Sequence, residues 1–150
     1  MLAILIGAGV LLFFAYEVYG AKLMTQPTTD FTSALANAIA KAEGTSPSAN
    51  NPGSLTAGDV PSESIIGEFN SAGVVLIDTI ENGWNYLNAK LRNILSGNSS
   101  VYSPSMTISE FAQKYTGGDN AEGWANTVSS QLGVTPDTTL AEAEAQFNGG

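Results

Sequence analysis

The group best placed for chemistry in this sequence is the carboxyl of Glu43. It ends a predicted helix, Phe31–Glu43, and precedes a turn-rich polar loop that contains Asn50-Asn51-Pro52-Gly53-Ser54-Leu55. The chain has no His and no Cys, so acid–base catalysis would have to rest on one of its 14 Asp and Glu carboxyls. A carboxyl that is partly buried at the negative end of a helix keeps its proton more readily than one in water, as a general acid requires. The alternative is an ordinary solvated surface residue.

Composition excludes several classes of function. Without Cys the chain has no disulfide, no thiolate nucleophile and no thiolate-bound metal, and without His it lacks the commonest metal ligand. We therefore expect neither a metal nor a cofactor. The net charge of −9 argues against nucleic acid as a partner, because such binding depends on Lys and Arg that neutralise phosphates.

The N-terminal segment has a different composition from the rest of the chain. Residues 2–16 carry no charge and are almost wholly apolar. A helix that continues to residue 21 would be about 30 Å long, which matches the hydrocarbon core of a bilayer. The sequence thus predicts a single transmembrane anchor over residues 1–22 and a polar linker over residues 23–30. A signal peptide is an alternative, although only the amino terminus supplies positive charge, and so is a core helix, although no face is polar.

Residues 31–150 predict one small domain that is mainly α-helical, in the α+β class. Asp30 is the expected N-cap of the first helix and Gly44 its stop. Short apolar runs on either side of Asn70-Ser71-Ala72-Gly73 predict one β-hairpin. Further helices are expected from three capping patterns and one loop break, namely Asp78 with Glu81, Thr107 with Glu110, Thr139 with Glu142, and Gly117–Asn120 before a helix that ends at Gly133.

Several of these segments carry a family resemblance when they are taken in order. The first helix ends in Ala42-Glu43-Gly44, the loop contains Asn50–Leu55, and Gly83-Trp84 lies near the start of the helix after the hairpin. Thr107-Ile108, Tyr115, Asn120 and Leu132-Gly133-Val134 follow. This order resembles small lysozyme-like domains of the lytic transglycosylase type, which are common in phage virion proteins and in some bacterial envelope proteins. The resemblance covers roughly residues 33–142.

The resemblance implies a fold and a reaction. The fold would be a small lysozyme-like helical domain with one short hairpin. Glu43 would be the catalytic residue, first protonating the glycosidic oxygen between N-acetylmuramic acid and N-acetylglucosamine, then taking the proton of the C6 hydroxyl to give a 1,6-anhydro product. Hydrolysis by two carboxylates is the second choice, with Asp59 as the candidate partner and a solvated turn residue as its alternative role.

Other residues are candidates for binding the sugar. Asn51, Pro52 and Gly53 would shape the cleft wall beside Glu43, with the Asn51 amide bonding either sugar or backbone. Tyr115 would face the sugar or bond Glu43, or else pack in the core. Asn120 is a second substrate-binding candidate or a helix cap. Trp84 and Trp124 have the spacing of core residues, with a sugar-stacking platform as the alternative role.

The expected function is therefore that of a membrane-anchored peptidoglycan lytic transglycosylase. Its partners would be peptidoglycan glycan strands, the lipid bilayer and other virion proteins. Its location would be single-pass in the inner membrane of a virion or in a bacterial cell envelope. The alternative is a structural membrane-bound virion or envelope protein on the same fold that has lost catalysis.

Overall fold

The computed structural model describes residues 25–44 and 49–150. The anchor predicted over residues 1–22 lies outside these ranges. Among the residues described, no helix combines the length and the apolar character needed to cross a bilayer.

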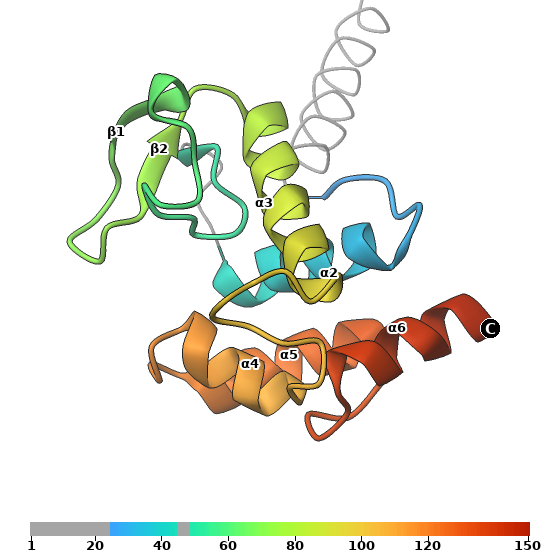
Figure 1. The fold of residues 1–150 in the computed structure, drawn as a ribbon. Helices are drawn as coiled ribbons and strands as arrows, with labels where there is room; N and C mark the ends of the chain where they lie inside the picture. Colours follow the sequence, from blue (N-terminus) through green and yellow to red (C-terminus); the bar gives the residue numbers. More distant parts are fainter. Residues whose placement is uncertain (1–24, 45–48) are drawn as a thin grey trace, which may run out of the picture.

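The described part of the chain is mainly helical, with one two-stranded sheet, as predicted (Figure 1). A 3-10 turn, Ser62–Ser64, precedes the sheet. The elements in chain order are α2 (Phe31–Glu43), β1 (Ile65–Glu68), β2 (Val75–Ile77), α3 (Ile80–Leu95), α4 (Ile108–Tyr115), α5 (Ala121–Leu132) and α6 (Leu140–Gly149).

Helix α2 is the centre of the domain, in contact with α3, α5 and α6. The Asp30 side chain accepts a hydrogen bond from the Ser33 amide, and the Ser33 side chain accepts one from the Asp30 amide. The predicted N-cap is therefore confirmed. Gly44 ends the helix with φ of 58°, a left-handed conformation that glycine adopts without strain. Helix α5 packs against both α2 and α4. Its Trp124 is buried and packs against the rings of Phe111 and Tyr115.

The hairpin is antiparallel and pairs Ile65 with Ile77 and Glu68 with Val75, with an irregularity between Ile65 and Gly67. It is fixed to the loop after α2 because the Val75 amide donates to the Leu55 carbonyl at 3.1 Å. The predicted hairpin is confirmed, and it forms one wall beside the end of α2.

One predicted helix start is wrong by one residue. Thr79, not Asp78, is the N-cap of α3, and its hydroxyl accepts from the Asn82 amide at 3.1 Å. Asp78, which precedes this N-cap, instead accepts a hydrogen bond from the side chain of Asn82. The capping boxes of Thr107 with Glu110 and of Thr139 with Glu142 are confirmed.

The chain that leads into α2 is attached to the domain. Asn37 in α2 exchanges hydrogen bonds with the Gln26 backbone, both at 2.9 Å. The side-chain amides of Gln26 and Asn88 in α3 bond each other reciprocally, at 3.0 and 2.7 Å. We call residues 25–28 the strap. The described part of the predicted linker is therefore held against two helices.

Candidate active site

Glu43 is half-buried at the last position of α2, and one of its carboxylate oxygens is fixed by a neighbour. Its Oε1 accepts a hydrogen bond from Nε1 of Trp124 in α5 at 2.8 Å. Within the described residues, Oε2 accepts no hydrogen bond. The carboxyl is thus oriented through Oε1 by the indole N–H of Trp124.

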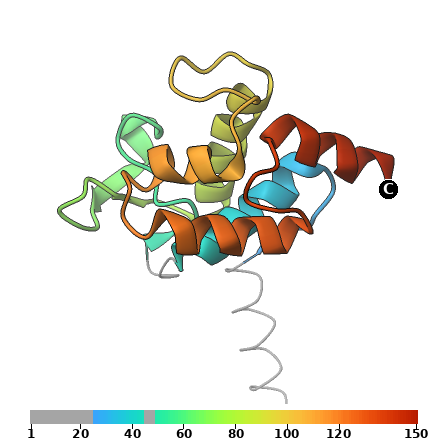
Figure 2. The same ribbon diagram turned by 90° about the horizontal axis from the view of Figure 1, so that it is seen from below.

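Glu43 lies on a groove of about 540 Å³, a size typical of small-ligand sites. The groove runs between the end of α2, the hairpin and the turn from α4 to α5, which lie on the same side of the molecule in Figure 2. Half of the 14 lining residues carry a neutral hydrogen-bonding side chain, and three are charged. The residues that line it are Ala42, Glu43, Ser54, Thr56, Asn70, Ala72, Val74, Lys114, Tyr115, Thr116, Gly117, Asp119, Asn120 and Trp124.

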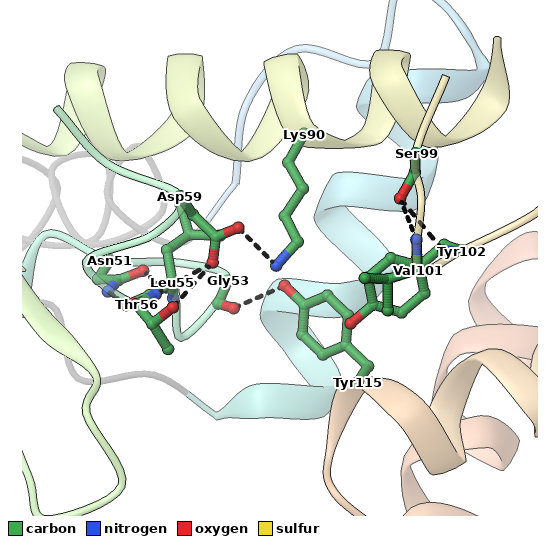
Figure 3. Close-up of polar contacts among 10 residues, drawn as sticks. All are labelled: Asn51, Gly53, Leu55, Thr56, Asp59, Lys90, Ser99, Val101, Tyr102 and Tyr115. Atoms are coloured by element: carbon green, nitrogen blue, oxygen red, sulfur yellow. Dashed lines mark hydrogen bonds and ion pairs between the residues drawn. The ribbon is translucent and has the colours of Figure 1, made fainter. Parts of the chain in front are cut away.

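Tyr115 contributes its ring to the groove and its hydroxyl to the loop. The hydroxyl donates to the Gly53 carbonyl at 2.7 Å (Figure 3), and the ring packs on Trp124 with centroids 5.2 Å apart. Burial, followed by the negative charges of Glu43 and Asp59, raises the pKa of Tyr115 well above its ordinary value. Tyr115 is therefore a neutral wall residue that does not bond Glu43.

Asn51, Pro52 and Gly53 lie behind the groove wall. The Asn51 side chain is 1% exposed, and its amide donates to the carbonyls of Leu55 and Val75 and accepts from the Leu55 amide. Pro52 and Gly53 are also buried. These three residues build the loop, while direct contact with a ligand falls to Ser54 and Thr56, which line the groove.

Asp59, the candidate second carboxylate of a hydrolase, does not line this groove, and both of its carboxylate oxygens have partners elsewhere. Its Oδ1 pairs with Lys90 Nζ at 3.0 Å, and its Oδ2 accepts from the Thr56 amide at 3.2 Å. Figure 3 shows the Lys90 ammonium directed between Asp59 and Tyr115, 5.0 Å from the Tyr115 ring centroid. The Asp59–Lys90 pair fastens the loop to α3 beneath the groove.

Asn120 keeps an exposed side chain at the groove and does not cap α5 with it. It occupies the N-cap position with φ of 49°, but its side chain makes no capping hydrogen bond. The amide lies over Gly123, where a Cβ would come within 2.6 Å of Asn120 Oδ1. Asn120 can therefore offer its amide to a ligand.

Sequence reasoning missed several groove residues, among them Trp124, Lys114 and Asp119. Trp124 was expected in the core rather than as a sugar-stacking platform, and it is indeed buried, yet its Nε1 contacts Glu43. Lys114 and Asp119 bring charge of opposite sign to the groove and carry no recognisable motif. Among the described residues, no group of three or more His, Cys, Asp or Glu could hold a metal ion.

The arrangement can exchange a proton with a hydroxyl-rich ligand. One carboxyl is oriented by an indole N–H, and hydroxyl and amide groups surround it. Comparison with known proteins gives no relative, because no protein family, curated protein or solved structure matches this chain.

Proposed function

We propose that this domain has a lysozyme-like fold and acts as a peptidoglycan lytic transglycosylase, with Glu43 as its only acid–base catalyst. The observation that carries the proposal is the position of Glu43, oriented by Trp124 in the lining of a groove half of whose residues carry neutral polar side chains. Hydroxyl and amide groups of this kind suit the hydroxyl and acetamido groups of a glycan.

In the proposed reaction, Glu43 first acts as an acid. It gives its proton to the glycosidic oxygen as the bond from C1 of N-acetylmuramic acid to that oxygen breaks. The electron pair of the broken bond stays on the leaving oxygen. The resulting carboxylate takes the proton of the C6 hydroxyl as O6 bonds to C1, and this restores the acid and yields the 1,6-anhydro sugar.

The Trp124 hydrogen bond has a defined part in this cycle. An N–H donor to Oε1 keeps the carboxyl plane fixed in both protonation states, so that Oε2 carries the proton in each step. The acetamido group of the substrate would stabilise the developing positive charge, and a second carboxylate is then not needed. Asp119 also lines the groove and would be the partner of Glu43 if the reaction were hydrolysis instead.

The proposed location is a membrane, with the chain single-pass in the inner membrane of a virion or in a bacterial envelope. Support comes from the uncharged, apolar sequence of residues 2–16. An anchor of this kind joined to a small cell-wall-cutting domain suits local opening of the wall.

The test is clearing of purified peptidoglycan by the full chain in detergent. Glu43→Gln keeps the size of the side chain and removes the acid, so clearing should fall by about 10² to 10⁴. Glu81→Gln is the matched control, because Glu81 is exposed in the first turn of α3, away from the groove. Mass spectrometry of the products would show anhydro ends for a lyase and reducing ends for a hydrolase.

Each outcome has a distinct meaning. Equal clearing by wild type and Glu43→Gln would reject Glu43 as the catalyst. Absence of clearing by wild type would reject the enzyme and leave a structural membrane protein on the same fold.

A further inference from the structure

The groove contains one unpaired cation in a chain that has few. The sequence has 5 Lys and Arg against 14 Asp and Glu. Lys90 is neutralised by Asp59 at 3.0 Å, whereas Lys114, exposed in the last turn of α4, forms no ion pair within the described residues. Its ammonium is therefore available to a ligand in the groove that it lines.

The other charged groups in the groove lining are both acidic. Glu43 and Asp119 would repel a carboxylate, and Lys114 would attract one. An acidic ligand in this groove thus has its lowest energy in the orientation that brings its carboxylate to Lys114. This selects one register of the ligand relative to Glu43.

We propose that Lys114 binds a carboxylate of the sugar strand and is a specificity-determining residue. This inference rests on the proposed function and names its substrate class, a glycan that carries carboxylates, in preference to a neutral one. Such a carboxylate has two possible sources. It belongs either to the lactyl group of a muramic acid without peptide, or to the peptide stem that is attached to that group.

Lys114 also lies at the negative end of the α4 dipole, where any cation stabilises a helix. Lys41 has the same placement in the last turn of α2, is exposed, and does not line the groove. Lys41→Gln therefore removes an equivalent helix-end charge and is the matched control for Lys114→Gln.

The experiment compares three substrates, with the full chain in detergent at low salt. The first is glycan strands with intact peptide stems. The second is the same strands trimmed by an amidase, so that the lactyl carboxylate is free. The third is the trimmed strands with every carboxylate converted to a methylamide.

The expected effect is selective. Lys114→Gln should lower kcat/KM about fivefold on strands that carry the recognised carboxylate, the ratio that corresponds to ~1 kcal/mol for an exposed ion pair. It should leave the methylamide strands unchanged. Lys114→Arg should keep the preference, Lys41→Gln should not alter it, and added salt should weaken it. A loss on stem-bearing strands alone assigns the peptide carboxylate, and a loss on trimmed strands alone assigns the lactyl group.

An equal loss on all three substrates, or no loss on any, would overturn the inference. Failure of the proposed function is separate, because wild type would then cleave none of the strands. Binding of the same three uncut strands to wild type and Lys114→Gln would then decide the role of Lys114 by the same comparison.

Discussion

The hydrogen bond from Trp124 to Glu43 permits a sharp prediction about catalysis. Trp124→Phe removes the Nε1–H donor, which lies 2.8 Å from Glu43 Oε1, and keeps a ring to pack against Phe111 and Tyr115. A hydrogen bond to a charged group contributes about 1.5–3 kcal/mol. If this energy orients the carboxyl for proton transfer, kcat/KM should fall about tenfold to a hundredfold, since each 1.4 kcal/mol is a factor of ten.

Trp84→Phe is the matched control, because it makes the same change in ring size without the contact to Glu43. Trp84 is 7% exposed and Trp124 is 4% exposed, and Trp84 Nε1 has no hydrogen-bond partner among the described residues. Both variants should lose about 1–2 kcal/mol of unfolding free energy through the smaller ring, and Trp124→Phe should also lose the contribution of the hydrogen bond to Glu43.

The assay is the clearing rate of peptidoglycan, measured well below the unfolding temperature of each variant. Only Trp124→Phe should be slow there. If the two variants clear at the same rate, the hydrogen bond does not position Glu43, and the reasoning about its orientation is refuted.

Three further predictions concern the wall of the groove. Gly83→Ala should lower the unfolding free energy by about 3 kcal/mol in denaturant titrations, since its Cβ would overlap the backbone oxygen of Asn50; a loss below about 1 kcal/mol would show that the loop yields. Asp59→Asn should lower the unfolding free energy by about 1–3 kcal/mol, because the ion pair with Lys90 is lost. Mass spectra of the products should still show anhydro ends. Reducing ends in the products of wild type but not of the variant would restore Asp59 as a hydrolytic partner. The pKa of Tyr115 is raised above 10.0 in the folded protein, so with rising pH the Tyr115 hydroxyl loses its proton in the unfolded chain first. The contribution of Tyr115 to the unfolding free energy is therefore complete below about pH 10 and is lost as the pH rises towards the folded pKa. Tyr115→Phe should flatten this alkaline decline in stability, and an unchanged slope would contradict the assignment.

The helices could be predicted because their ends are local signals. The reciprocal bonds of Thr107 with Glu110, and of Thr139 with Glu142, each depend on four consecutive residues, and both formed as expected. The start of α3 was misplaced because Asp78 and Thr79 are both good caps, and only the tertiary position of the chain selects between them.

The site was harder to predict, because it depends on the direction of individual atoms. Helical spacing shows that Trp124 is buried, but cannot show that Nε1 points at a residue 81 positions away in sequence. In the same way, the sequence left open whether the Asn51 amide bonds a sugar or the backbone, and the contacts with Leu55 and Val75 favour the backbone. Glu43 could be singled out as a candidate because its helix end and the following loop are both visible in sequence, and the structure places it in the lining of a groove.

The strap, residues 25–28, belongs to the folded unit. Because Gln26 bonds Asn37 and Asn88, the folded unit includes residues that precede the first residue of α2. If the chain leaves a bilayer at residue 22, the four peptide units to Gln26 reach at most about 14 Å. Under the proposed function, a tether that short would confine the protein to the layer of cell wall against the membrane, so distant strands would be cut only after lateral diffusion of the whole protein.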